Sequence, residues 1–382
     1  MSEGRPGLPL EARLSERPPV QRRGLVKALG VSGALGAMGA LAALAPLGLA
    51  VVPGPARAAA PAPASFALIG DVPYGSGEET KLARVIDAIN ASHAAGGVQW
   101  VVHTGDVKRS RERCDDRLLQ RRFDLFRRLV PPFVITPGDN DWTDCHRVPS
   151  GRYLPVERLA RLRQIFYPRP GLSSAGRAEP VLTQALAPGQ ADAHRAHVEN
   201  QCWSFAGVTM ATVHVVGSHN GLEPWDDLDP ADREDRPRPD RLADFKAREA
   251  AAVAWIDTAF DHAQAHGHAG VVIAMQANPG LHRTARDPAR RGFNQVLDRL
   301  TRRAAAFGRP VLLAHGDTHT YRFDAPLAHA AAHTRLPRLA NLRRVENFGS
   351  PQVHWVEVRV DASTAEVFTA VPHYVLANLL PF

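Results

Sequence analysis

The dipeptide Gly-Asp follows an apolar run four times in this chain, and this repetition constrains the fold more than any other feature. The four copies are Gly70-Asp71, Gly105-Asp106, Gly138-Asp139 and Gly316-Asp317. A single Gly-Asp after a strand usually marks a turn or the N-cap of a helix. Four copies in equivalent positions instead predict that the carboxylates meet, because ligand sites of open α/β sheets lie at the carboxyl ends of the strands.

Apolar runs alternate with amphipathic segments over most of the chain after residue 60. The runs that predict strands are Phe66–Ile69, Trp100–Val102, Phe133–Ile135, Val271–Met275 and Val311–Leu313. Segments between them carry apolar residues at three- and four-residue spacing, which is the pattern of amphipathic helices. This alternation predicts an α/β fold, and without a visible internal repeat we expect one domain over residues 59–382.

The last part of this domain has a different pattern. Residues 353–371 alternate apolar and polar side chains, which predicts antiparallel strands joined by a turn at 361–364. Three segments rich in Pro, Gly, Arg and Asp, at 168–200, 217–240 and 324–341, show little periodicity. We expect these segments to be loops over one face of the domain.

The first 58 residues have the composition of an export signal. Arg22-Arg23 and Lys27 precede a charge-free stretch over 28–56, and Ala56-Arg57-Ala58 offers small residues for cleavage. This arrangement resembles a twin-arginine signal peptide. The alternative is an uncleaved anchor, because the apolar stretch is long enough to span a bilayer. We favour cleavage, and therefore predict a periplasmic or secreted protein that meets the membrane only during export.

The formal charge of +7 comes mainly from this N-terminal segment. It holds seven of the 46 Lys and Arg residues and three of the 39 Asp and Glu residues, which leaves 39 basic and 36 acidic residues in the remainder. Nucleic-acid binding requires a basic face, and this nearly neutral remainder has no basic run interleaved with aromatic residues. We therefore expect no nucleic-acid partner, while the oligomeric state is left open.

Four converging carboxylates repel one another unless a cation lies between them. Two divalent metal ions, which lie about 3.5 to 4 Å apart in two-metal sites, would balance the four Asp charges. The Gly-Asp turns therefore predict a divalent metal site, most simply one that holds two ions.

The order of these motifs resembles that of the calcineurin-like metallophosphoesterases, whose motifs run Asp-x-His, Gly-Asp, Gly-Asn-His-Asp/Glu, a lone His and Gly-His-x-His. The resemblance implies a two-sheet α/β sandwich flanked by helices, with mixed sheets and C-terminal antiparallel strands. It also implies hydrolysis of a phosphomonoester or phosphodiester bond in a small phosphorylated substrate, through a metal-bound hydroxide. By position, Asp71 matches the first metal ligand and Asp106 the carboxylate that bridges both metals.

The chain departs from the family pattern at four histidines. The third motif reads Gly138-Asp139-Asn140-Asp141, the last reads Gly316-Asp317-Thr318-His319, and Gln276 stands near the place of the lone His. The first motif lacks its His as well, with Tyr74 close by; Tyr74, Gln276 and Asn278 are the candidate substitutes. The resemblance thus predicts catalytic positions at Asn140 and Asp141, and metal ligands at Asp71, Asp106, Asp139, Gln276, Asp317 and His319.

Exchanging imidazoles for carboxylates hardens the ligand set, which favours manganese or magnesium, with iron, zinc or calcium as alternatives. Asn140 cannot transfer the proton that the family His gives to the leaving group. That proton would come from His103, His146 or His315, or the substrate would have a good leaving group. His103 and His315 have a structural interpretation too, as packed strand residues bonded to the backbone.

Two alternatives stay open at the level of the sequence. In an oxidising compartment Cys114 and Cys145 could pair, or all three cysteines, including Cys202, could be free thiols. The favoured function is an exported, metal-dependent phosphoric ester hydrolase. The other is a non-catalytic protein that keeps the metallophosphoesterase fold as a binding module, because four family histidines are replaced.

Overall fold

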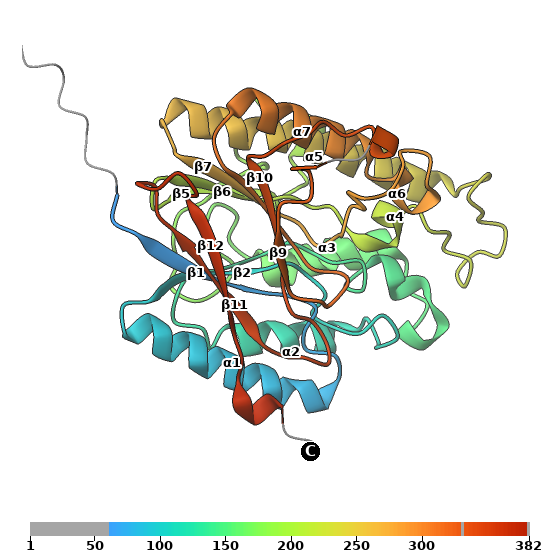
Figure 1. The fold of residues 1–382 in the computed structure, drawn as a ribbon. Helices are drawn as coiled ribbons and strands as arrows, with labels where there is room; N and C mark the ends of the chain where they lie inside the picture. Colours follow the sequence, from blue (N-terminus) through green and yellow to red (C-terminus); the bar gives the residue numbers. More distant parts are fainter. Residues whose placement is uncertain (1–60, 330–331, 380–382) are drawn as a thin grey trace, which may run out of the picture. The chain divides into compact units, whose positions relative to one another are not determined.

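A computed structural model describes residues 61–329 and 332–379. The predicted export signal over residues 1–58 lies outside the described residues. Within them, two β-sheets pack face to face and helices cover the outer faces (Figure 1). The two-sheet α/β sandwich predicted above is therefore confirmed.

The first sheet has the strand order β12-β11-β1-β2-β3. Its strands are β1 (Ala64–Ile69), β2 (Val98–His103), β3 (Phe133–Ile135), β11 (Trp355–Val360) and β12 (Phe368–His373). The β1, β2 and β3 strands are parallel, whereas β11 is antiparallel to both β1 and β12. The predicted antiparallel C-terminal strands are thus confirmed, and they extend this sheet beyond β1.

The second sheet has the strand order β4-β5-β6-β7-β8-β10-β9. Its strands are β4 (Leu182–Thr183), β5 (Gln201–Phe205), β6 (Val208–Thr212), β7 (Gly270–Ala274), β8 (Val311–His315), β9 (Arg322–Asp324) and β10 (Leu342–Glu346). The β6, β7, β8 and β10 strands are parallel. The sequence pattern missed β10, because Arg343 and Arg344 interrupt its apolar residues; Arg344 is buried and pairs with Asp324 of β9.

Helices α1 (Ser76–Ala94), α2 (Asp116–Phe126) and α3 (Pro155–Phe166) pack on the first sheet, and α5 (Pro239–Ala265) and α7 (Asn294–Phe307) on the second. The α4 (Gly217–Gly221) and α6 (Pro288–Arg291) helices are short. Short 3-10 turns lie at Thr143–His146, Val148–Ser150, Asp192–His194, Ala332–Thr334 and Leu376–Asn378. The described residues contain no helix long and apolar enough to span a membrane.

Alternate residues of the central strands face opposite layers. Phe66 and Leu68 of β1 belong to the cluster between the sheets, where they meet residues such as Met210 and Leu312 of the second sheet. Their neighbour Ile69 faces the helices instead. Burying a Leu or Phe side chain contributes about 1.5 to 3 kcal/mol, so this shared layer holds the two sheets together. The continuous apolar character of the strands follows from burial on both faces.

A disulfide joins Cys114 to Cys145 across 31 residues, while Cys202 is a free, buried thiol. Cys114 precedes α2, and Cys145 lies a few residues after the third Gly-Asp turn. The pairing proposed as one of two alternatives is therefore the one found. It fixes the loop after β3 to the loop after β2.

Candidate metal site

The four Gly-Asp turns follow β1, β2, β3 and β8, and their aspartates come together at the carboxyl ends of these strands. The backbone N–H of Asp317, from the second sheet, lies 3.1 Å from Asp71 Oδ1. The backbone N–H of Asn140 donates to Asp106 Oδ1 at 3.0 Å. Both sheets therefore contribute to one site, as the repetition of the dipeptide predicted.

Several residues of the site have a left-handed backbone. The φ angles are 55° at Asp71, 60° at Asp106, 82° at Asp317 and 60° at His319. Residues other than glycine rarely adopt such angles, and at functional sites each costs on the order of 1 to 3 kcal/mol. This strained backbone conformation turns the four side chains toward one another.

A steric reason explains the glycines that precede Asp139 and Asp317. A Cβ atom on Gly138 would overlap the Asp106 carboxylate, and one on Gly316 would overlap the Asp71 carboxylate. Each glycine thus makes room for the aspartate of a different turn. A larger residue at either glycine would therefore displace the aspartate of another Gly-Asp turn.

Asp71 is fully buried. Its Oδ2 accepts a hydrogen bond from Asn347 Nδ2 at 2.9 Å, and its Oδ1 lies 3.7 Å from His319 Nε2. Burial raises the pKa of this carboxyl well above its ordinary value, and the charges of Asp317 and Asp139 raise it further. The site thus disfavours the ionised form of Asp71 unless a cation is present.

Asp106 is held by the third motif and by Tyr74. The Tyr74 hydroxyl donates to Asp106 Oδ2 at 3.0 Å, accepts from Asn140 Nδ2 at 2.8 Å, and lies 3.4 Å from His319 Nε2. Burial raises the pKa of Asp106 strongly, and the neighbouring carboxylates add to the shift. Tyr74, named above as a substitute for a missing His, therefore lies among residues of three other motifs.

The two aspartates of the third motif have different surroundings. The Asp139 Oδ2 accepts a hydrogen bond from Ser218 Oγ at 2.6 Å. Asp141 is fully buried and accepts backbone N–H bonds from Gly138 at 2.8 Å, Asp106 at 3.0 Å and Val107 at 2.8 Å. Burial raises the pKa of Asp141 to about 6 in spite of these bonds. Asp141 thus positions the turns after β2 and β3.

Asp317 is bound mainly by neighbours from the second sheet. Its Oδ2 accepts the backbone N–H of Asn278 at 3.0 Å, and its Oδ1 lies 3.4 Å from Gln276 Nε2. The amide oxygen of Gln276 accepts the Gly217 N–H at 2.5 Å. Burial, together with the Asp139 charge, raises the pKa of Asp317 to about 7. Gln276 in this arrangement orients Asp317 and the turn that begins at Gly217.

Two of the three histidines considered as proton donors, His103 and His315, lie in packed surroundings. His103 accepts the Gly105 N–H at 2.9 Å and has its Nε2 3.2 Å from the Val72 carbonyl, and burial lowers its pKa to about 3. His315 is buried against the Gly316 carbonyl, and burial lowers its pKa to about 3 as well. For both residues the geometry favours the structural interpretation.

Three further residues belong to the site, although the sequence did not single them out. Asn347 follows the unpredicted strand β10 and also accepts the Thr104 hydroxyl at 2.6 Å. Ser218 lies in α4, where three successive residues have left-handed φ angles of 50° to 61°. Lys108 is fully buried near Asp141 and Asp144. Only the polar residue types near strand ends could have indicated them.

The chemistry of these residues suits a hard divalent cation. Four aspartates with few counter-charges meet in a mostly buried space, and the pKa values of Asp71, Asp106 and Asp317 are all raised by burial and by one another. A cation would relieve this repulsion. Over residues 61–329 and 332–379, however, no three His, Cys, Asp or Glu side chains already form a closed set of metal ligands. The donors fit a metal by type and charge.

The fold and these turns can be compared with known proteins. A model of the calcineurin-like phosphoesterase family matches residues 64–321, which is more than half of the chain. This segment begins with β1 and includes all four Gly-Asp turns and His319. No curated protein sequence matches the chain significantly. Because the matched segment carries the strands that bring the four carboxylates together, the chain belongs to the calcineurin-like phosphoesterase family, a family of metal-dependent phosphoesterases.

Proposed function

We propose that this chain is an exported, metal-dependent hydrolase that cleaves the phosphomonoester or phosphodiester bond of a small phosphorylated substrate. The observation that carries the proposal is the meeting of four family-positioned aspartates, three of which, Asp71, Asp106 and Asp317, have raised carboxyl pKa values. Such a cluster is unfavourable without a cation, and a cation is what phosphoester hydrolysis in this family uses. The metals proposed are two divalent ions, with manganese or magnesium favoured by the oxygen-rich donor set.

The residues that would hold these ions are Asp71, Asp106, Asp139, Asp317 and His319. When bound, divalent metals polarise the phosphoryl oxygens and stabilise the charge that develops there. Gln276 is the remaining predicted ligand, although its amide oxygen already accepts the Gly217 N–H. Asp141 and Asn347 would act by holding the turns that carry the ligands.

Asn140 holds the Tyr74 hydroxyl rather than supplying a proton, since an amide is not an acid at neutral pH. This feature favours substrates whose leaving group needs little protonation. A cavity of about 240 Å³ beside Asp317 offers a place for the substrate. His219, His282 and Arg283 are among its lining residues and would favour an anionic ligand.

The Cys114–Cys145 disulfide supports the proposed export, because disulfides persist in oxidising compartments. Replacing Arg22-Arg23 with Lys-Lys in the full chain would test the twin-arginine signal. We expect the variant to stay in the cytoplasmic fraction, whereas the unaltered chain reaches the periplasm or the medium. Equal export of both chains would exclude this route.

The enzyme proposal is tested by elemental analysis of the purified protein, together with hydrolysis of bis-p-nitrophenyl phosphate and p-nitrophenyl phosphate under added manganese. Wild type is expected to hold metal and hydrolyse one or both esters, and Asp106→Asn to lose both properties. Asp124→Asn is the matched control, since Asp124 lies on the exposed face of α2. A wild type that binds metal but hydrolyses neither ester would instead favour the binding module, which the replaced histidines motivate.

A further inference from the structure

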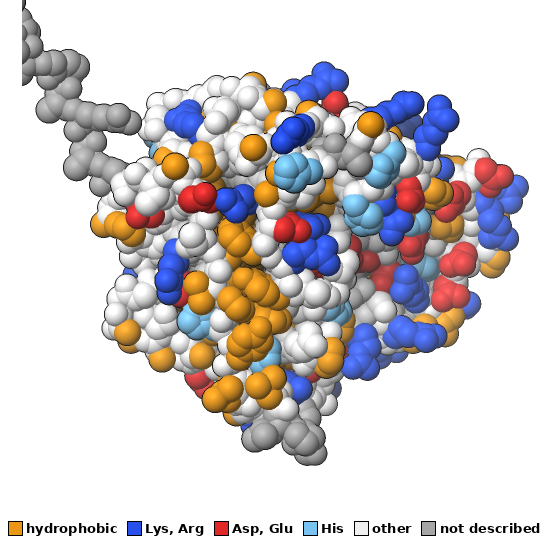
Figure 2. All heavy atoms as spheres, viewed as in Figure 1, with side chains coloured by type: hydrophobic (Ala, Val, Ile, Leu, Met, Phe, Trp, Pro, Cys, Tyr) orange, Lys and Arg blue, Asp and Glu red, His pale blue; other side chains and the backbone are white. Residues whose placement is uncertain are grey.

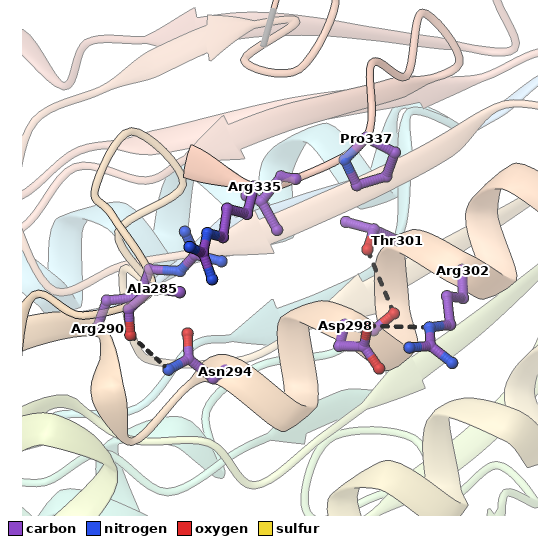
Figure 3. Close-up of a pocket in the computed structure, with 9 residues that line it drawn as sticks. Ala285, Arg290, Asn294, Asp298, Thr301, Arg302, Arg335 and Pro337 are labelled. Atoms are coloured by element: carbon purple, nitrogen blue, oxygen red, sulfur yellow. Dashed lines mark hydrogen bonds and ion pairs between the residues drawn. The ribbon is translucent and has the colours of Figure 1, made fainter. Parts of the chain in front are cut away.

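A second cavity, of about 680 Å³, lies away from the Gly-Asp turns and is lined by α6, α7 and the segment 335–337 (Figure 3). Three arginines line it, Arg290 from α6, Arg302 from α7 and Arg335. One acidic residue, Asp298, is part of the lining. The cavity therefore carries excess positive charge.

This excess is concentrated on one side of the cavity. Asp298 Oδ1 accepts a hydrogen bond from Arg302 Nε at 2.9 Å, so these two charges neutralise each other. Within the described part of the chain, neither Arg290 nor Arg335 forms an ion pair. In Figure 3 the Arg290 and Arg335 side chains extend toward the same part of the view, whereas Asp298 lies beside Arg302. Two like charges in this arrangement favour an anion between them.

Arg290 adds a second, independent observation. Its side chain is only 3% exposed, and its Nη1 donates to the carbonyls of Arg283 and Thr334 at 2.6 Å each. Its Nε, in contrast, is buried and has no hydrogen-bond partner. Buried donors are nearly always paired, so an unpaired guanidinium nitrogen in a cavity wall indicates a missing acceptor.

Asn294 indicates what else the ligand carries. Its Nδ2 donates to the Ala285 carbonyl at 2.8 Å, while its Oδ1 is buried without a partner. The cavity thus presents guanidinium donors together with one amide acceptor. A ligand that satisfies both carries negatively charged oxygens and one hydrogen-bond donor, such as an O–H group.

From this pairing we propose that the cavity is a second anion site, which binds a phosphate group bearing or accompanied by a hydroxyl. Protonated inorganic phosphate and the phosphate of a small hydroxylated molecule share this chemistry. Arg335 would clamp the phosphate from the open side, since it is exposed, while the buried Arg290 forms the floor. Figure 2 shows Lys and Arg side chains interspersed with Asp and Glu side chains on the face of the molecule viewed in Figure 1.

The test is calorimetric titration of the full chain with inorganic phosphate, comparing wild type with Arg335→Gln. Losing one guanidinium should weaken this binding event about tenfold or more, because charge-assisted bonds to phosphate are strong. Arg338→Gln removes the same charge just after this segment but not from the cavity, and should bind as wild type does. Equal binding by wild type and Arg335→Gln would overturn the proposal.

Two further arms separate this site from the catalytic one and identify the ligand. Phosphate inhibition of ester hydrolysis reports on the Gly-Asp turns and should be the same in Arg335→Gln as in wild type. Sulfate carries no proton at neutral pH and should bind this cavity about tenfold more weakly than phosphate; equal affinities would overturn the role of Asn294. Hydroxypropylphosphonate binding more tightly than phosphate would identify a hydroxylated molecule, and the reverse would identify the free ion.

Discussion

The Gly-Asp site and the arginine cavity are two regions of unbalanced charge with opposite sign, and they are built differently. Asp71, Asp106 and Asp141 are buried and held by backbone N–H groups, side-chain amides and a nearby disulfide. In the cavity Arg290 is buried and donates to two backbone carbonyls, while Arg335 lies on an exposed segment. A buried cluster of like charges suits ions that require fixed geometry, whereas one exposed arginine suits a ligand that enters and leaves.

The largest effect on activity should come from replacing an aspartate at the centre of the Gly-Asp site. Asp71→Asn removes one negative charge while keeping a similar shape, and we expect kcat/KM for bis-p-nitrophenyl phosphate to fall about 100- to 1,000-fold. Metal content, measured on the same samples, should fall as well. Asp298→Asn, in the arginine cavity, serves as the contrasting variant. Similar losses in both variants would mean that the two regions do not differ in function.

A second test concerns the disulfide that stabilises the loops beside the Gly-Asp site. Replacing Cys114 and Cys145 with alanine should lower the free energy of unfolding by about 3 to 4 kcal/mol, given a closed loop of 31 residues. Urea denaturation of the oxidised proteins measures this difference. Cys202→Ala, which removes a thiol without a disulfide, should have a smaller effect. A double variant as stable as wild type would show that the fold braces these loops without the covalent bond.

The dependence of stability on pH should separate the metal-free from the metal-loaded protein. The pKa values of Asp141 and Asp317 are raised to about 6 and about 7 in the folded chain, so these two groups bind more protons in the folded than in the unfolded state above about pH 4. Their contribution to the stability of the metal-free protein should therefore be lost as the pH rises from about 4 to 7. Bound metal should weaken or reverse this trend. Thermal melting with and without chelator measures both curves, and coincident curves would contradict the expectation.

The smallest effect expected is that of Tyr74→Phe, which removes only the hydroxyl between Asp106 and Asn140. Loss of such an orienting bond should weaken metal affinity about tenfold. Manganese titration followed by activity measures the change. Tyr153→Phe, whose hydroxyl contacts Arg113 outside the site, is the control. An unchanged affinity would show that Asp106 is held adequately by the Asn140 N–H alone.

The sequence predicted the sandwich and the meeting of the aspartates because both follow from local patterns. Strand periodicity and a repeated dipeptide are visible without knowledge of the fold. Asn347 and Ser218 could not be predicted in the same way, because they reach Asp71 and Asp139 from 276 and 79 residues away. Strand β10, which positions Asn347, was hidden by two arginines, of which Arg344 is buried because it lies opposite an aspartate of the partner strand β9.

His103 and His315 show a related difficulty. A histidine just before a Gly-Asp turn has the residue type expected of a proton donor, and only the observed packing shows the ring bonded to backbone near the turn. Residue type alone therefore cannot separate a catalytic from a supporting histidine. Burial and hydrogen-bond partners make that distinction.

The position of the site at the border between the two sheets has a mechanical consequence. Asp71, Asp106 and Asp139 move with the first sheet and Asp317 with the second, so an ion held by all four would join the two halves of the sandwich. Its binding free energy would then oppose separation of the sheets by mass action. Hydrogen exchange at the ends of β1 and β8 should slow together when metal is added, and the protein would be most resistant to local opening in its metal-loaded form.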